Sequence, residues 1–143
     1  MANTETAGLF HFSLVSPEAV LLSENIRMVT VPGAAGDFGI LADHAPLLSS
    51  LRDGVAVIDR EDGSSIRVFV SGGFADVNGN VCTLLAEDAA MVDELDRAEL
   101  THERDRLDER MKMLEEDGNL DEAKKQRMMR RLERLEAKIA LAA

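Results

Sequence analysis

The sequence predicts a segregated α+β fold, with an N-terminal all-β domain over residues 1–87 and a C-terminal antiparallel two-helix hairpin over residues 88–143. Two changes near Glu87 support this division. All three prolines, all five phenylalanines and nine of the ten glycines precede that residue. At the same place the spacing of apolar residues changes from short alternating runs to a helical repeat. The two parts are therefore expected to fold as different classes of structure.

Short apolar segments separated by turn residues fill the first part. Phe10, Phe12 and Leu14 share one face of an expected strand, because alternate residues of a strand point to the same side. Further strands are expected at residues 26–31, 54–58, 66–70 and 81–85. The dipeptides at residues 62–63 and 78–79, Asp-Gly and Asn-Gly, suit tight hairpin turns because they tolerate positive φ. Many short strands at this spacing indicate a sandwich or a barrel.

After Glu87 the apolar spacing is helical. The first helix has one apolar stripe: Leu100, Leu107, Met111 and Leu114. Gly118 suits the left-handed residue that ends many helices, and Asn119 followed by Glu122 suits the start of a second helix. The second helix has an apolar seam of its own: Met128, Leu132, Leu135 and Ile139. So short a connection predicts that the helices fold back antiparallel.

The hairpin is not expected to be stable alone. Burial of its eight seam residues stabilises it by less than the conformational entropy lost in ordering about fifty residues. It therefore needs the β domain or a partner to pack against. A helix pair that depends on a docking surface can exchange one surface for another, which is a physical basis for a switch.

The composition argues against several classes of protein. A formal net charge of −11 disfavours binding to nucleic acid or to anionic membranes, because both are polyanions. No apolar run approaches the ~20 residues that span a bilayer, so direct membrane insertion is not expected. The first eight residues contain Glu5 and no basic residue, unlike a secretory or organellar signal. Cys82 has no second cysteine to pair with, and we expect a buried, inert thiol.

Sequence motifs for catalysis or metal binding are missing. Asp43 and His44 are adjacent, and adjacent side chains rarely point the same way. The three histidines, His11, His44 and His102, are too scattered to form a metal cluster. The glycine-rich stretch at residues 33–39 lacks the lysine and the following helix of a phosphate-binding loop, so tight turns explain it better. We therefore expect no catalytic residue, no metal and no cofactor.

Two segments resemble the epsilon subunits of bacterial F-type ATP synthases. Residues 31–58, VPGAAGDFGILADHAPLLSSLRDGVAVI, contain a Gly-x-x-Gly-acid-x-Gly-Ile turn followed by His-Ala-Pro-Leu-Leu. Residues 69–89, FVSGGFADVNGNVCTLLAEDA, resemble the Ser-Gly-Gly strand, hairpin and last strand of that family. The chain length, the order of strands before helices and the acidic balance agree with this resemblance.

The resemblance implies a flattened sandwich of about ten strands in a protein without catalytic residues of its own. In that family the sandwich binds the rotor stalk subunit gamma and rests on the membrane c-ring. Ser16 and His44 match gamma-facing positions, and Asp37 matches the position that meets the c-ring. Without the family match, Asp37 would be interpreted as an ordinary turn carboxylate. The implied location is peripheral, on the cytoplasmic side of the bacterial inner membrane.

Some members of that family bind ATP through a Leu/Ile-Asp-x-x-Arg-Ala motif on the first C-terminal helix. Here Leu95 and Asp96 match, but Glu99 and Leu100 stand where arginine and alanine are needed. The Arg-Ala dipeptide at residues 97–98 comes two residues early, about 200° around a helix. Glu99 would also repel a phosphate. The degenerate motif therefore argues against ATP sensing.

The two expected helices carry opposite charge. Residues 88–117 contain twelve acidic and five basic residues, whereas residues 121–143 contain four acidic and seven basic ones. Five cations form a basic stripe beside the seam of the second helix: Lys124, Arg127, Arg131, Arg134 and Lys138. This stripe is either a solvated face that complements the acidic first helix or a surface for an acidic partner.

Three functions fit these observations to different degrees. The leading hypothesis is a rotor subunit that couples proton flow to ATP synthesis and restrains ATP hydrolysis through its helices. Its partners would be the gamma subunit, the c-ring and the catalytic alpha and beta subunits. A free-standing adaptor or chaperone that grips clients with its hairpin is a second hypothesis, which co-purification would distinguish. A small hydrolase that uses His44 is a third, and it would require activity in the isolated protein.

Overall fold

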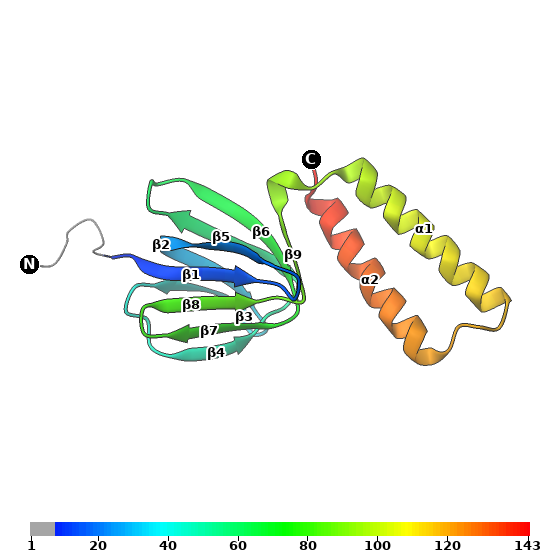
Figure 1. The fold of residues 1–143 in the computed structure, drawn as a ribbon, viewed down its shortest axis with the longest axis horizontal. Coiled ribbons are helices and arrows are strands. Elements are labelled where there is room, and N and C mark those ends of the chain that lie inside the picture. The colour runs from blue at the N-terminus through cyan, green and yellow to red at the C-terminus, as the bar shows by residue number, and fades with distance from the viewer. Residues whose placement is uncertain (1–7) are drawn as a thin grey trace, which may run out of the picture. The chain divides into compact units, whose positions relative to one another are not determined.

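The computed structural model describes residues 8–143, and the N-terminal segment considered above as a targeting signal lies outside them apart from Gly8. Nine strands come first: β1 (Phe10–Val15), β2 (Val20–Gly33), β3 (Gly36–Leu41), β4 (Leu47–Ser50), β5 (Gly54–Arg60), β6 (Ser65–Ser71), β7 (Phe74–Asn78), β8 (Val81–Leu85) and β9 (Asp88–Met91). A short 3-10 helix, η1 (Val92–Glu94), precedes two α-helices, α1 (Arg97–Glu116) and α2 (Glu122–Leu141) (Figure 1). The described residues thus form nine strands where the resemblance implied about ten.

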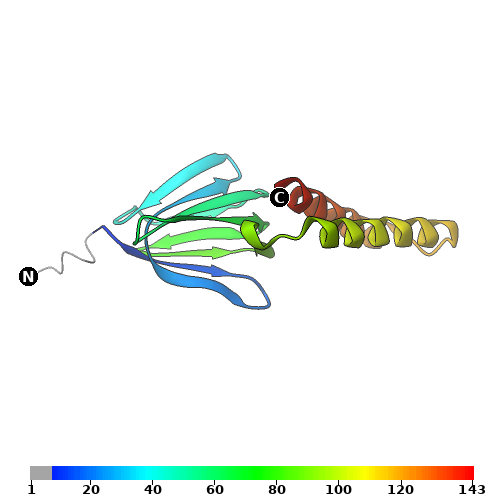
Figure 2. The same ribbon diagram turned by 90° about the horizontal axis from the view of Figure 1, so that it is seen from above.

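The strands form a sandwich of two layers (Figure 2). Their order is β4-β7-β8-β1-β2-β5-β6-β9, and β3 pairs with β2 beside that path. β2 connects the layers, because its first half pairs with β1 and its second half pairs with β3 and β5. A register shift between Ile26 and Met28 marks the change, as expected where a bulge bends a strand. The sandwich alternative is therefore confirmed.

Alternating side chains build the core between the layers. Phe10, Phe12 and Leu14 are buried, whereas His11 and Ser13 between them are only half-buried. This is the pattern that the sequence predicted for the first strand. Both predicted hairpin turns are also confirmed, since glycines 63 and 79 have φ values of 88° and 62° between β5 and β6 and between β7 and β8.

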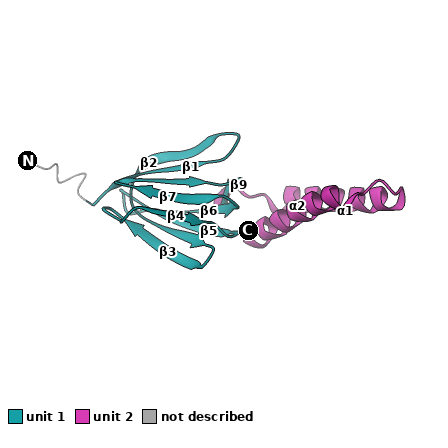
Figure 3. Cartoon of the chain, turned by 90° about the horizontal axis from the view of Figure 1, so that it is seen from below, with its two compact units in different colours: residues 1–91 teal, residues 92–143 magenta. Residues whose placement is uncertain are grey.

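The short strand β9 extends the sandwich beyond Glu87. It pairs antiparallel with β6, from Ser71 opposite Asp88 to Val68 opposite Met91. The chain accordingly divides into compact units of residues 1–91 and 92–143 (Figure 3), which is four residues later than the sequence placed the boundary. Four residues reading Asp-Ala-Ala-Met show no polar–apolar alternation, so sequence periodicity could not identify them as a strand.

The connection between the helices differs from prediction at one end. Gly118 has φ of 69°, its amide donates to the Glu115 carbonyl (3.1 Å), and the Asn119 amide donates to the Leu114 carbonyl (2.8 Å). This is the predicted glycine termination, in Schellman form. The predicted cap of α2 at Asn119 is wrong. Asp121 caps that helix instead, accepting a hydrogen bond from the Lys124 amide at 2.7 Å, because Asn119 is used to close α1.

The two antiparallel helices share a thin apolar seam. Helix α1 has no buried residue, and in α2 only Leu135 and Ile139 are buried. The other two seam residues of α2, Met128 and Leu132, are half-buried. The hairpin therefore lacks a core of its own, in agreement with the expectation that it depends on a docking surface.

Candidate interaction surfaces

Ser16 lies in the tight turn between β1 and β2. Its amide donates to the Ala19 carbonyl at 2.9 Å, and its hydroxyl lies 3.4 Å from the same oxygen. The turn borders a hollow of about 380 Å³ whose largely apolar lining includes Pro17, Phe74 and Leu85. Ser16 therefore stands at the margin of an apolar surface.

His44 lies at the opposite end of the sandwich, in the loop between β3 and β4. Within residues 8–143, the preceding Asp43 is the one non-glycine residue with positive φ, at 62°. Its amide donates to the Asn80 side chain at 2.9 Å, which holds the loop beside the β7–β8 turn. The half-buried His44 ring donates from Nδ1 to the Ala45 carbonyl at 2.7 Å.

The outer face of one layer connects these two ends. In the β7–β8 pair, Phe74 lies opposite Leu85 at the Ser16 end, and Asn78 lies opposite Val81 at the His44 end. Four large apolar side chains are exposed there at 47–69%, and we call them the apolar face: Leu48, Phe74, Val81 and Leu85. Exposed apolar patches of this kind usually mark interaction sites.

A polar strip borders the apolar face on β1 and β2. Strand β1 runs parallel to β8, which places His11 beside Val81. The His11 ring has Nδ1 3.3 Å from Asn25 Oδ1 and Nε2 3.1 Å from Ser23 Oγ, with Ser13 Oγ also within 3.4 Å of Nε2. Both ring nitrogens have partners, so a protein could cover the strip without leaving either unpaired. Sequence reasoning did not find the strip, because its residues meet only through strand register.

Asp37 is exposed at the start of β3, next to the glycine-rich turn, and forms an ion pair with Arg52. The same guanidinium donates from Nη1 to the Gly33 carbonyl at 2.7 Å. The turn lies at the Ser16 end, since the amide of residue 51 donates to the carbonyl of Gly73, which lines the hollow beside Ser16. The structure thus places Ser16 and Asp37 at one end and His44 at the other. Arg52 was not among the predicted site residues.

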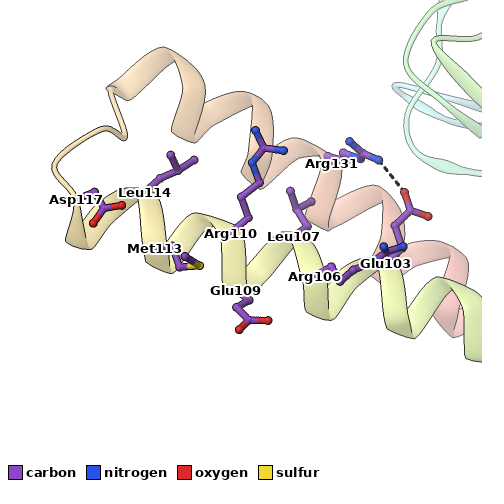
Figure 4. Close-up of a pocket in the computed structure, with 9 residues that line it drawn as sticks. All are labelled: Glu103, Arg106, Leu107, Glu109, Arg110, Met113, Leu114, Asp117 and Arg131. Carbon is purple, nitrogen blue, oxygen red and sulfur yellow. Dashed lines mark hydrogen bonds and ion pairs between the residues drawn. The ribbon is translucent and has the colours of Figure 1, made fainter.

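On the hairpin, a groove of about 560 Å³ runs along α1 and reaches α2 at Arg131 (Figure 4). Its lining combines apolar side chains such as Leu107 and Leu114 with the cations Arg106 and Arg110. A neighbouring hollow of about 250 Å³ is lined partly by Lys124, Arg127 and Arg131. Three of the five basic-stripe residues therefore face hollows of the hairpin.

Other contacts of the basic stripe are internal to the chain. Arg131 donates to Glu103 across the hairpin at 2.8 Å (Figure 4), and both Arg134 and Lys138 have interaction partners. A second cross-hairpin pair joins Arg104 of α1 to Glu136 of α2 at 3.5 Å. The Arg131–Glu103 pair agrees with the interpretation in which the stripe complements the acidic first helix, whereas the Arg104–Glu136 pair has its cation on α1 and its anion on α2. Exposed pairs contribute only about 0–1 kcal/mol each, so a partner could displace them.

The two residues that match the ATP motif have structural roles. The Leu95 amide donates to the Val92 carbonyl at 3.2 Å and closes η1. Asp96 is the N-cap of α1, and its carboxylate accepts a hydrogen bond from the Glu99 amide at 3.1 Å. The hydrogen bond that Arg104 donates to the Asp105 carboxylate, followed by the nearby charge of Glu136, raises the pKa of Arg104. These contacts account for Asp96 and Arg104 without a nucleotide.

The described residues offer little chemistry for catalysis. Burial raises the pKa of the Cys82 thiol to about 12, so the thiol stays protonated and unreactive near neutral pH. Among residues 8–143, no three His, Cys, Asp or Glu side chains lie where they could hold a metal ion. Neither α1 nor α2 has the length and hydrophobicity of a membrane span, and no other described helix does.

Comparison with known sequences identifies the sandwich. The family model of the ATP synthase delta/epsilon chain β-sandwich domain matches residues 9–92. The ATP synthase epsilon chain of Mesorhizobium japonicum is 45% identical over 94 residues, which cover 66% of this chain and 70% of that one. The ATP synthase epsilon chain of Brucella canis is 42% identical over 110 residues, covering 77% and 79%.

Solved structures share the fold at lower identity. A chain of the Euglena gracilis mitochondrial ATP synthase (OSCP/F1/c-ring) matches with a TM-score of 0.68 and 24% identity, covering 92% of this chain and 80% of that one. A chain of the Tetrahymena thermophila mitochondrial ATP synthase central stalk and c-ring matches with a TM-score of 0.54 and 20% identity, covering 93% and 96%. The sandwich is thus of the ATP synthase delta/epsilon type. The chain belongs to the epsilon family of bacterial F-type ATP synthases, as the sequence resemblance predicted.

Proposed function

We propose that this epsilon chain is a non-catalytic rotor subunit that couples proton flow through the c-ring to ATP synthesis. The sandwich binds gamma through the apolar face and rests on the c-ring through the turn that carries Asp37. The observation that supports this most strongly is the apolar face, which extends between the turn of Ser16 and the loop of His44. A partner that touches both residues must cover that face.

The chemistry of the face suits a mainly apolar partner surface. In strands β4, β7 and β8 the single charged residue is Asp76. Covering the four side chains of the apolar face stabilises a complex by roughly 25 cal/mol for each Å² removed from water. The His11 strip beside the face supplies hydrogen-bonding groups that give the contact a defined orientation.

The hairpin is the regulatory part of this proposal. Its seam is thin and its cross-hairpin ion pairs are exposed, so its helices can leave one docking surface for another at small cost. In the exchanged state the basic stripe meets an acidic surface of the catalytic alpha and beta subunits and restrains ATP hydrolysis. The subunit then acts peripherally, on the cytoplasmic side of the bacterial inner membrane.

The test is a change of the apolar face that leaves the core intact. We expect Phe74→Glu and Leu85→Glu each to weaken binding of the full chain to its purified gamma subunit at least tenfold, measured by calorimetric titration. The matched control is Arg67→Glu, an exposed strand residue of the other layer. All three variants should unfold within about 0.5 kcal/mol of the parent, as surface changes do. Unchanged gamma affinity in both face variants would refute this site.

A further inference from the structure

We infer that Arg52 is the positioning residue of the turn proposed to meet the c-ring, so that the turn presents a joined carboxylate and guanidinium to its partner and not a lone carboxylate. This inference rests on the proposed function of Asp37. The residue pattern did not indicate that Arg52 pairs with Asp37, because the two residues are fifteen positions apart in the chain.

Arg52 bonds to both arms of the turn. Its amide donates to the Pro32 carbonyl at 3.0 Å, and its Nη1 donates to the Gly33 carbonyl at 2.7 Å, both at the end of β2. Its Nη2 donates to Asp37, on β3. Pro32 lies opposite Asp37, and Gly33 lies opposite Gly36. One planar guanidinium therefore donates hydrogen bonds both to the last residue before the turn and to the first carboxylate after it. The single ammonium of a lysine cannot reproduce this geometry.

Apart from Arg52, backbone pairing holds the turn: Gly33 lies opposite Gly36 at the end of the β2–β3 ladder and bridges to Leu51. Its centre consists of Ala34 and Ala35, which carry no polar side chain, followed by Gly36 with φ of 135°. A Cβ at Gly36 would meet nothing within 4 Å, so packing does not restrain that residue. Outside Arg52, the Ala34 amide donates to the Ser50 carbonyl at 2.9 Å. Because Gly36 is exposed and glycine is conformationally permissive, we expect the Arg52 contacts to fix the direction in which the Asp37 side chain points.

The pairing also sets the kind of partner the turn fits. Arg52 and Asp37 keep 46% and 60% of their side chains exposed, so both can be reached from outside. Their charges compensate each other, and a partner must offer hydrogen-bond donors and acceptors together. A neutral polar loop meets that requirement. A lone cation would have to displace Arg52 from Asp37, although the hydrogen bond from Arg52 to the Gly33 carbonyl keeps the guanidinium in place.

A double-mutant cycle tests the inference in the assembled stalk. The variants are Asp37→Asn, Arg52→Gln and the two together, with Arg67→Gln as the matched control, and the measurement is binding of the chain–gamma complex to the purified c-ring. We expect each single change to weaken binding about three- to tenfold and the double change to weaken it no further, because Arg52 acts through Asp37. Arg52→Lys should recover part of the loss. Additive losses, or an Arg52→Gln variant that binds like the parent, overturn the inference.

A measurement on the free chain separates this inference from the proposed c-ring contact. Backbone NMR order parameters of residues 34–36 should fall from about 0.85 toward 0.6 in Arg52→Gln and stay unchanged in Arg67→Gln. If the turn loosens but no variant changes c-ring binding, Arg52 positions the turn and the proposed contact is wrong. If the order parameters do not change, Arg52 does not position the turn, whatever the binding shows.

Discussion

Two glycines with similar backbone conformations show that an alanine substitution can destabilise the fold in two ways, by backbone strain and by a steric clash of the added Cβ. Gly63 has φ of 88° and Gly73 has φ of 94°, so alanine would be strained at either. A Cβ at Gly63 would meet nothing within 4 Å, but a Cβ at Gly73 would lie 1.7 Å from the Leu85 carbonyl oxygen. Gly73 therefore permits a close approach of two backbones as well as an unusual φ.

We expect Gly63→Ala to lower the free energy of unfolding by about 1–2 kcal/mol, the cost of one left-handed alanine. Gly73→Ala should lower it by more, roughly 3 kcal/mol or above, because the backbone around Leu85 must move. Urea unfolding followed by far-UV circular dichroism measures both. Equal losses in the two variants would show that the approach at Gly73 is not close in solution.

Cys82 predicts a pH dependence of stability. Burial, with a smaller contribution from the charge of Asp76, raises the pKa of its thiol to about 12. An unfolded thiol ionises near pH 8.5, so between about pH 9 and 12 the unfolded chain binds fewer protons than the folded one, and stability falls as pH rises. Cys82→Ala removes this pH-dependent contribution to the free energy of unfolding. The free-energy difference between parent and variant should shrink from pH 7 to pH 10, and a constant difference would contradict the burial of the thiol.

The site residues differ in how far sequence could predict them. Asp37 and His44 lie within a segment that resembles the family, so the motif predicts them without a structure, whereas Ser16 lies before both segments. Arg52 and His11 act through partners that are distant along the chain, fifteen residues for the Arg52–Asp37 pair and twelve for the His11–Ser23 pair. Strand register brings these groups together, and no local pattern encodes it.

At the scale of elements, the start of α1 predicts the response to nucleotide. Asp96 caps the helix, and Arg104 is paired with Asp105 and Glu136. Binding ATP would require breaking these contacts beside the acidic Glu99. We expect calorimetric titration of the isolated chain to detect no ATP binding at millimolar concentration. A dissociation constant well below that range would show that Arg97, Arg104 or Arg106 binds phosphate in another register.

The start of α2 shows why the position of a cap is harder to predict than the helix itself. Asn119 and Asp121 are both good N-cap residues, and each has Glu or Lys three positions later. The sequence does not show that the Asn119 amide is already committed to the Leu114 carbonyl. Competition between closing one helix and starting the next therefore selected Asp121.

At the scale of the whole molecule, the alternating residues of β1 and the turns at Gly63 and Gly79 made the sandwich predictable. Two features were not. The long β2 serves both layers, and its change of partner at Ile26 follows from the bulge and not from a turn signal. The short β9 becomes a strand only because the edge of β6 is available beside it. Tertiary pairing, which sequence periodicity cannot show, decided both.

The position of β9 predicts where the sandwich can be cut. We expect a fragment of residues 1–91 to unfold cooperatively and to keep its affinity for gamma, because the apolar face lies wholly within it. A fragment of residues 1–87 loses β9 and exposes the edge of β6 from Val68 to Ser71, so it should unfold at lower urea concentration. Circular dichroism and gamma titration of both fragments provide the measurement. Equal stability would mean that β9 adds nothing to the sandwich.

The regulatory proposal makes opposite predictions for two kinds of hairpin variant. Truncation after Gly118 removes α2 with its seam and basic stripe, and should raise ATP hydrolysis in the assembled enzyme. Replacing the five stripe cations together should raise it in part, and high salt should have a similar effect by screening. Glu103→Gln should lower hydrolysis, because it frees Arg131 from its 2.8 Å pair and favours exchange toward the catalytic subunits.

A pair worth about 0–1 kcal/mol limits the effect of Glu103→Gln to about fivefold in the population of the exchanged hairpin. Glu109→Gln is the matched control, since it makes the same charge change on α1 at a residue outside the Arg131–Glu103 pair. Steady-state hydrolysis by the assembled enzyme, at low and high salt, distinguishes the variants. If truncation leaves hydrolysis and synthesis unchanged, the hairpin does not regulate the enzyme, and the basic stripe serves only to complement the acidic α1. If truncation matters but Glu103→Gln and Glu109→Gln behave alike, the hairpin regulates without releasing Arg131.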